Sequence, residues 1–352
     1  MYEFLPCRDV PGPRYFDLSK MKFHKEKNTF GLKYGQWTDD ASMGLCMADS
    51  LIVNRRYDGS DMRQRFWNWW HRGYNNAFRL DADRRFPHSV GLGGNISESL
   101  DEMSDLWNGE QPTPVYESGG EDAGNGSLMR FAPVALFFHS IPLIDLHHFS
   151  RQSSYTTHPG TIAAESCALL GHLIVRALQR PLGEPVDPKA FLEMATSEFI
   201  ELTGLEEKCK SYDDCFSASG HYQNLLWLAS GRPARETEHC WSWREPSLGL
   251  KKTLRARGGE YNGYPVSSGY FGSYAPDGLA IALWAVYNSN SFDEAVAKCI
   301  NTLGDADSHG SICGQLAGAL YGYSSIHPQF LEWLNKWDHH EFAVRAVLLH
   351  EL

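Results

Sequence analysis

Apolar residues recur at helical spacing along most of the chain, and the strict alternation typical of β-strands is nearly absent. The longest such pattern begins at Thr161, just after the break made by Pro159 and Gly160, and runs to about Gln179. The pattern predicts an all-α fold. Further helices are expected at about 97–107, 131–139, 189–203, 276–287 and 291–303, with one or two closing helices within 328–352.

Two regions depart from this helical pattern. Residues 1–34 contain prolines that interrupt any early helix, so this segment is expected to be irregular. Residues 204–263 are polar, with scattered tryptophans and no internal repeat. We interpret them as a loop-rich elaboration of the main domain, and we therefore expect the whole chain, 1–352, to form a single domain.

Composition limits the classes of protein to which this chain can belong. Its 352 residues include 43 acidic and 32 basic side chains, for a formal net charge of −11. Because nucleic-acid binders normally carry a basic surface, this charge argues against a nucleic-acid partner. An anionic substrate would need local arginines, backbone amides or metal ions to offset the negative field.

Cysteine usage and hydropathy indicate the compartment. The eight cysteines form no C-x-x-C pair, so neither a zinc site nor a disulfide framework is expected, and we predict a reducing, cytoplasmic location. The first residues have neither the basic nor the apolar segment of a signal peptide. No apolar run approaches the roughly 20 residues that span a bilayer. We therefore expect a soluble protein without a membrane partner, and a monomer.

Two carboxylates open a helix of small residues towards the end of the chain. Asp305 and Asp307 are followed by Ser308 and then by a glycine at every fourth position. Since a glycine inside a helix costs about 1 kcal/mol relative to alanine, we interpret the repeat as a close backbone approach to a neighbouring helix. A carboxylate cluster at the start of such a rigid helix is suited to a hard cation. The repeated glycines are Gly310, Gly314, Gly318 and Gly322.

A second acidic cluster stands near the start of the chain. Thr38 has the character of a helix N-cap, with Asp39 and Asp40 in the first turn, where the helix dipole favours negative charge. Taken alone, this pattern is more often structural than catalytic. If the fold joins the two clusters, their oxygens suit Mg²⁺, Mn²⁺ or Ca²⁺, and four carboxylates carry enough charge for two divalent ions. The sequence by itself does not show that the clusters meet.

Two further motifs have candidate chemistry. The glycine-rich segment 118–130 leads into a helix and can present amide donors to a phosphate, to which Arg130 can add a positive charge. Such a loop is on its own more often a simple connector. His158 lies before Pro159 at another helix start, where a lone histidine is usually a capping or surface residue.

Five motifs in this order resemble those of the ADP-ribosylglycohydrolase family, and they extend from about residue 34 to residue 323. Residues 35–43 resemble its W-T-D-D-T-x-M motif, 124–133 its G-N-G-x-x-M-R-x-x-P loop, and 304–319 its closing D-x-D-T…A-G-x-x-A-G motif. Residues 157–159 and 268–270 match two further landmarks. Five ordered matches outweigh the structural interpretation of each motif taken singly.

The resemblance implies a single compact orthogonal bundle of helices that binds two Mg²⁺ ions, with Mn²⁺ as an alternative. The ions would be held by the two acidic clusters, Thr38, Asp39, Asp40, Asp305, Asp307 and Ser308. The phosphates and distal ribose of ADP-ribose would contact Asn125, Gly126, Ser127, Leu128 and Met129. The ribose or adenine walls would include His158, Gly269 and Tyr270.

The activity that the resemblance implies is hydrolysis of the bond between C1″ of ADP-ribose and a modified protein side chain, or a small ADP-ribosylated molecule. The metals would hold the ribose diol and a water, while a carboxylate moves the proton. Candidates for that carboxylate are Glu3, Asp40 and Asp307.

The chain departs from the family pattern in two places. The family usually begins with a helix that carries G-D-A-x-G, and here that helix is missing before Glu3, which matches an acidic site residue of some members. Ser308 stands where the family usually has threonine, which keeps the oxygen ligand. The alternatives are an inactive relative that binds ADP-ribose or is structural, and a dinuclear phosphoesterase on another fold. The choice between arginine and serine linkages stays open.

Overall fold

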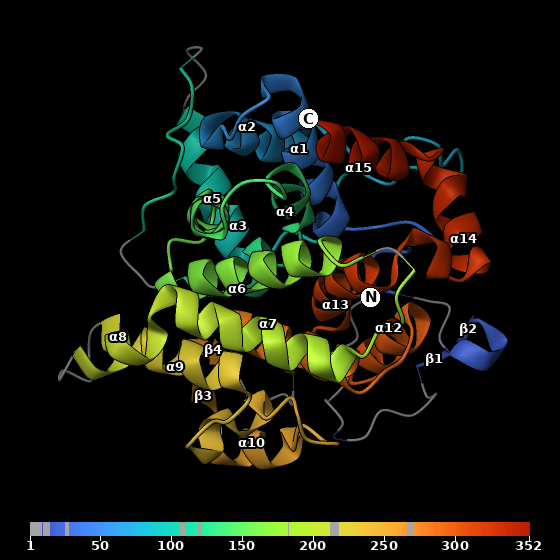
Figure 1. Ribbon diagram of the computed structural model, residues 1–352. Helices are drawn as coiled ribbons and strands as arrows, with labels where there is room; N and C mark the ends of the chain where they lie inside the picture. The colour runs from blue at the N-terminus through green and yellow to red at the C-terminus, as the bar shows by residue number, and fades with distance from the viewer. Residues whose placement is uncertain are drawn as a thin grey trace. The chain divides into compact units, whose positions relative to one another are not determined.

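The computed structural model consists mainly of α-helices, with two pairs of two-residue strands in its described part (Figure 1). Strand β1 (Phe16–Asp17) pairs with β2 (Lys22–Phe23), and β3 (Glu260–Tyr261) pairs with β4 (Tyr264–Pro265), both antiparallel. The prediction of an all-α fold is confirmed. The structure describes residues 9, 15–24, 28–105, 110–118, 122–181, 183–211, 218–265 and 270–352.

The chain divides into two compact units, each built from two separate segments. We call them the 29–171 unit, which also contains residues 327–352, and the 172–326 unit, which also contains residues 1–28. The boundary between residues 171 and 172 falls inside helix α6 (Thr161–Leu178). This helix has a mean hydropathy of 1.4, and 83% of it is buried in the protein, as expected of a core helix.

Helix α1 is the centre of the 29–171 unit. It packs against α2, α4 and α15, and Figure 1 shows the red α15 beside the blue α1. The aromatic residues Phe66 and Trp69 of α2 are fully buried and belong to the core of this unit. The helices of this unit are α1 (Asp39–Asn54), α2 (Gly59–Arg72), α3 (Gly94–Asp101), α4 (Ala132–Phe137), α5 (Leu143–Tyr155), α14 (Pro328–Asp338) and α15 (Glu341–Glu351).

Helix α11 is the centre of the 172–326 unit. Every one of its residues is buried, and it packs against α12, α13 and α7. Its Asp277 accepts hydrogen bonds from Arg257 Nη2 at 2.9 Å and from Trp241 Nε1 at 2.7 Å, which satisfies a carboxylate in the core. The helices of this unit are α7 (Pro188–Thr203), α8 (Leu205–Ser211), α9 (Ala218–Ser230), α10 (Leu250–Arg257), α11 (Ala275–Tyr287), α12 (Phe292–Ile300) and α13 (Ala306–Tyr321).

The expectation that residues 204–263 are loop-rich is wrong. The described part of this segment holds the helices α8, α9 and α10, and two of its tryptophans belong to the core. Trp241 and Trp243 are fully buried, and Trp243 Nε1 donates to the carbonyl of Leu228 at 2.7 Å. Short helices with polar outer faces do not contain enough turns to show a clear apolar period, which is why the sequence pattern misses them.

The glycine repeat of α13 has a close neighbour at one of its positions. A Cβ added at Gly310 would lie 2.8 Å from Ile300 Cγ2 of α12, so the side chain of Ile300 packs directly against the backbone of α13 there. At Gly318 the nearest atom would be at 3.9 Å, an ordinary contact. At Gly314 no described atom of the unit lies within 4 Å. Close packing in this unit therefore accounts for Gly310 and not for the whole repeat.

Candidate active site

The first acidic cluster opens helix α1 in the 29–171 unit. Thr38 occupies the N-cap position, but its side chain makes no capping hydrogen bond. Its hydroxyl donates instead to Asp40 Oδ2 at 2.9 Å. Asp39 and Asp40 are only 5% and 8% exposed. The helix dipole stabilises both carboxylates, and the threonine orients one of them.

The backbone at Gly91 closes against this cluster. Its φ of +96° lies in the left-handed region, and a Cβ there would lie 2.1 Å from Asp39 Oδ1. The same Cβ would lie 3.0 Å from the Cβ of Thr38. Residue 91 must therefore be glycine for the aspartate to keep its position. The sequence offers only a glycine-rich stretch there, without a signal that it approaches Asp39.

The predicted substrate loop is a tight turn in the same unit. The carbonyl of Asn125 accepts hydrogen bonds from the amides of Leu128 at 2.9 Å and Met129 at 3.0 Å, so these two amides serve the turn itself. The Ser127 hydroxyl accepts from Ser154 Oγ at 2.9 Å. The side chains of Ser127, Leu128 and Met129 are all buried.

His158 lies against the glycines of this loop. A Cβ added at Gly126 would lie 2.8 Å from His158 Cε1 and 3.0 Å from Nε2, and one added at Gly124 would lie 3.2 Å from Nε2. The histidine is 2% exposed. Burial and the charge of Arg130 hold the pKa of His158 well below its usual value, so the ring is neutral. The structure thus brings His158 together with the loop that precedes it by some thirty residues in sequence.

The guanidinium of Arg130, which the sequence suggested as a charge for a phosphate, is bound by side chains of its own unit. Its side chain is buried beneath the loop, and its Nη2 donates to Thr156 Oγ1 at 3.0 Å and to Thr157 Oγ1 at 2.6 Å. The guanidinium stacks over the ring of Phe66 at 4.5 Å. Burial lowers the pKa of Arg130 to about 10, which leaves it a cation at neutral pH.

The second acidic cluster opens helix α13 in the 172–326 unit. Leu303 and Gly304, with φ of +67° and +70°, form a left-handed turn that leads into it. A leucine with positive φ is strained, and such strain is typical of sites where geometry matters. Asp305 occupies the N-cap position without a capping side-chain hydrogen bond, and it accepts from the Tyr270 hydroxyl at 2.5 Å.

The segment after Tyr270 supports this cluster through its backbone. The amide of Asp305 donates to the carbonyl of Phe271 at 2.8 Å. Gly272 has a φ of +111°, and a Cβ there would lie 2.8 Å from His309 Nδ1 and 3.3 Å from Asp305 Cβ. Tyr270, predicted to line the ribose or adenine, therefore also orients an acidic residue. Burial lowers the pKa of His309 to about 3, so this ring is neutral as well.

The donor chemistry of each cluster fits a hard divalent cation. Each supplies two carboxylates and one hydroxyl, from Thr38 in one unit and Ser308 in the other. Within the described residues, no three His, Cys, Asp or Glu side chains gather as a ready-made metal site. Glu3 and Gly269 lie outside the described residues.

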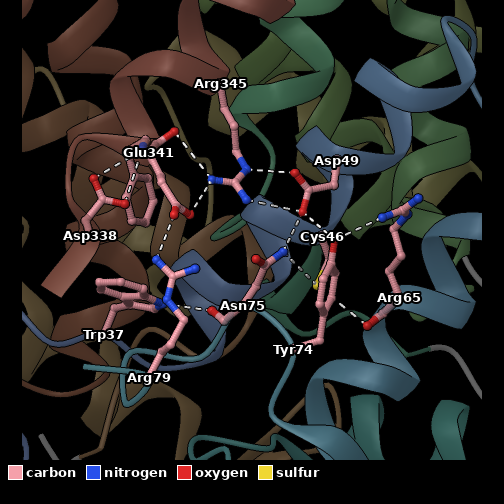
Figure 2. Close-up of polar contacts among 11 residues, drawn as sticks. Trp37, Cys46, Asp49, Arg65, Tyr74, Asn75, Arg79, Asp338, Glu341 and Arg345 are labelled. Atoms are coloured by element: carbon pink, nitrogen blue, oxygen red, sulfur yellow. Dashed lines mark hydrogen bonds and ion pairs between the residues drawn. The ribbon is translucent and has the colours of Figure 1, made fainter. Parts of the chain in front are cut away.

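A cavity of about 450 Å³ lies in the 29–171 unit, and none of the predicted site residues lines it. Figure 2 shows its polar wall, where Arg345 Nε bonds Asp49 at 2.7 Å and Arg79 bonds Glu341 at 2.7 Å. Trp37, the residue before Thr38, lines the cavity and donates from Nε1 to the carbonyl of Asn75. The network joins α15 to α1 and to the loop after α2.

Comparisons with known proteins agree with the motifs. The sequence model of the ADP-ribosylglycohydrolase family matches residues 2–351. The chain is 28% identical over 313 residues to the ADP-ribosylarginine hydrolase Tri1 of Pseudomonas putida, which covers 88% of this chain and 65% of that protein. It is 30% identical over 205 residues to the ADP-ribosylhydrolase ARH3 of Danio rerio, covering 57% of this chain and 49% of that protein.

A solved structure shows the same fold. It is titled an ADP-ribosylglycohydrolase-related protein complex, and it matches with a TM-score of 0.63 and 25% identity over 97% of this chain and 91% of its own. The chain thus spans slightly less than two thirds of its Pseudomonas relative, and nearly all of this fold. With a family match over almost every residue, the chain belongs to the ADP-ribosylglycohydrolase family.

Proposed function

We propose that this protein is a metal-dependent ADP-ribosyl hydrolase. It cleaves the C1″ glycosidic bond between ADP-ribose and a modified protein side chain or a small ADP-ribosylated molecule, in the cytoplasm. The observation that carries the proposal is that both acidic clusters are present at helix starts, each with a neighbouring hydroxyl turned onto a carboxylate. Thr38 bonds Asp40, and Tyr270 bonds Asp305.

Two Mg²⁺ ions, or Mn²⁺, are the proposed cofactors. When bound, such ions position a substrate diol and lower the pKa of a bound water. The ligands would be Thr38, Asp39, Asp40, Asp305, Asp307 and Ser308.

The protein's own residues prepare this chemistry. The Thr38 hydroxyl fixes the rotamer of Asp40, and the Tyr270 hydroxyl does the same for Asp305. A carboxylate of these clusters, Asp40 or Asp307, would take or give the proton at the glycosidic oxygen or the attacking water. The buried turn at Asn125 and the neutral His158 would hold ADP-ribose by its polar groups.

The names of the relatives guide the choice of substrate. The Pseudomonas relative is called an ADP-ribosylarginine hydrolase, whereas the name of the Danio relative gives no linkage. We therefore propose arginine-linked ADP-ribose as the first substrate to test, with serine-linked ADP-ribose beside it.

The test measures ADP-ribose release from both substrates with Mg²⁺ and with excess chelator. Asp40→Asn and Asp307→Asn keep the shape of each side chain and remove its charge. We expect each to lower turnover by about 10²- to 10⁴-fold, the usual contribution of a group that moves a proton. Asp145→Asn is the matched control, since Asp145 is an exposed acid in the first turn of α5. Full activity in chelator would refute the metal dependence. Binding of ADP-ribose without any release would indicate an inactive relative.

A further inference from the structure

We propose that Arg130 and Thr157 are positioning residues that fix the tautomer of His158. They hold its hydrogen on Nε2, so that the ring donates a hydrogen bond to an oxygen of ADP-ribose at the turn of Gly124 and Gly126. The choice of ADP-ribose rests on the proposed function. The tautomer does not rest on it: it follows from the hydrogen-bond network and from the neutral state of the buried ring.

Arg130 is a buried cation. Arg130 is 1% exposed, and among the described residues no carboxylate lies within ion-pair distance of its guanidinium. Its nearest partners are the hydroxyls of Thr156 and Thr157, the ring of Phe66 and the sulfur of Met43 at 3.6 Å. A buried cation without a paired carboxylate is costly, so its presence calls for a role beyond packing.

The hydrogen bonds of Arg130 to the two threonines have only one possible direction. A guanidinium only donates, so both threonine oxygens accept from Arg130. The Thr156 hydroxyl hydrogen is then used on the carbonyl of Ser153, at 2.7 Å. Among the described residues, the other hydrogen-bond neighbour of the Thr157 hydroxyl is His158 Nδ1, at 2.7 Å. The hydrogen of Thr157 is satisfied in this buried place only if it is donated to Nδ1.

The contact with Thr157 determines which nitrogen of the His158 ring carries the hydrogen. Nδ1 accepts, so it carries a lone pair, and a neutral imidazole must then carry its hydrogen on Nε2. The ring is neutral because burial and the nearby Arg130 charge disfavour the imidazolium. The same cation thus performs two tasks. It keeps His158 uncharged, and through Thr157 it selects which nitrogen donates.

The donor nitrogen of His158 faces the glycines of the predicted ADP-ribose loop. Nε2 lies against Gly124 and Gly126, at positions where an added Cβ would be 3.2 and 3.0 Å away. A side chain at either glycine would crowd this nitrogen, so glycine at both positions keeps the loop side of Nε2 free of one. The segment is tied to the loop by Ser154, whose hydroxyl donates to Ser127 and whose carbonyl accepts from the His158 amide at 2.8 Å. The donor is therefore held rigidly beside the predicted ADP-ribose loop.

The alternative is that Arg130 and Thr157 only fill the core. Substitution alone does not separate the two roles, because loss of packing also weakens binding. The tautomer does separate them, since a purely structural role does not require one nitrogen to carry the hydrogen. Nitrogen chemical shifts in ¹⁵N-histidine-labelled protein distinguish the two tautomers and the charged ring. The His158 signals are assigned by their loss in His158→Gln.

We expect the wild-type spectrum at neutral pH to show the neutral ring with hydrogen on Nε2. Thr157→Ser keeps the hydroxyl and should leave this signature unchanged. Thr157→Val keeps the shape and removes the hydroxyl, so it should give a mixture of tautomers. Its affinity for ADP-ribose, measured by calorimetry, should fall about threefold to tenfold, as expected for one hydrogen bond, and Thr157→Ser should restore it.

A hydrogen on Nδ1, or a charged ring, in the wild-type protein would overturn the proposal even if every variant were inactive. An unchanged signature in Thr157→Val would overturn the role of Thr157. If Thr157→Val does not fold, Thr157→Ala removes the same hydroxyl and replaces it in this test. A correct tautomer in a protein that does not bind ADP-ribose would refute the proposed ligand and the proposed function, and leave only the hydrogen on Nε2 established.

Discussion

Thr38 and Asp305 occupy equivalent places in two different helices. Each is the residue before a helix start, where a side-chain oxygen normally accepts a hydrogen bond from the first turn. That bond is worth about 1 kcal/mol, and neither residue makes it. Their polar atoms instead bond Asp40 and Tyr270. Both helices give up local stability to keep a cluster of oxygens in one arrangement, which is what a binding site requires.

The contact between Gly91 and Asp39 gives the first prediction at this scale. Gly91→Ala would place a methyl 2.1 Å from Asp39 Oδ1 at a strained φ of +96°, so the carboxylate must move. We expect ADP-ribose release to need much more Mg²⁺, by about tenfold or more if one ligand is displaced. Titration of activity against Mg²⁺ measures the change.

Gly94→Ala is the control for this variant. Gly94 lies three residues further on, at the start of α3, and no described atom of its unit lies within 4 Å of an added Cβ. We expect its Mg²⁺ requirement to match the wild type. If both variants shift the requirement alike, the approach of Gly91 to Asp39 does not matter for the metal.

Buried His172 gives a prediction on pH. Burial lowers its pKa to about 4, although Glu198 Oε2 lies 3.3 Å from its Nε2. The unfolded chain has an ordinary histidine that gains its proton near pH 6.5. Between pH 6.5 and 4 the unfolded state therefore binds one more proton, and stability falls as the pH falls, by about 1.4 kcal/mol per unit.

Urea unfolding at pH 7 and pH 5 measures this loss. His172→Leu removes the titrating group and keeps an apolar side chain against Phe199, whose ring contacts the histidine edge-on. We expect the variant to lose about 2 kcal/mol less than the wild type between the two pH values. An identical loss would mean that His172 does not titrate on unfolding. His309 should contribute with the same sign, since burial lowers its pKa to about 3.

Helix α13 supplies the prediction at the scale of elements. Gly310→Ala would push a methyl to 2.8 Å from the branched methyl of Ile300, so α12 and α13 must separate. We expect a loss of about 1–3 kcal/mol in the free energy of unfolding. Gly314→Ala meets no described atom of the unit and should instead stabilise the helix by about 0.5–1 kcal/mol. Thermal unfolding compares the two. Equal effects would contradict the packing assigned here to Gly310.

The elements that the sequence predicts well are long helices with an apolar buried face, such as α6 and α11. The hydrophobic periodicity of the sequence does not predict helix α5. Its buried side chains include His147, Ser150, Ser153 and Ser154, so its inner face is polar and shows no hydrophobic period. Two of these side chains donate to backbone carbonyls within the helix, Ser150 to Leu146 and Ser153 to Ser150, both at 2.7 Å.

The motifs predict which residues form the candidate site, because they lie in the order that the family shows. They do not predict how those residues are supported. The approach of Gly91 to Asp39 and the place of Arg130 under His158 join segments that no local pattern relates. A sequence shows a glycine or an arginine at these positions, and only the fold shows which side chain it meets.

Charge acts at the scale of the whole molecule. With a net charge of −11, the protein repels an anionic substrate at long range. ADP-ribose, the proposed ligand, carries a diphosphate, so its binding would depend on short-range attraction from the proposed cations and from neutral donors such as the one proposed on His158. Recognition of the substrate would therefore come from contacts inside the site and not from the charge of the surface.

Each unit is built from two segments that lie far apart in the chain, and this affects folding during synthesis. The backbone amides of Tyr15 and Phe16 bond the side chain of Asn301, and the carbonyl of Tyr34 accepts from Trp337 Nε1. Each unit therefore stays incomplete until a segment from the far end of the chain has been translated. Helix α1 leaves the ribosome early and must wait for α15, its apolar side uncovered. Such an interval favours aggregation and slow folding, so the nascent chain is expected to depend on chaperones more than a protein with local contacts does.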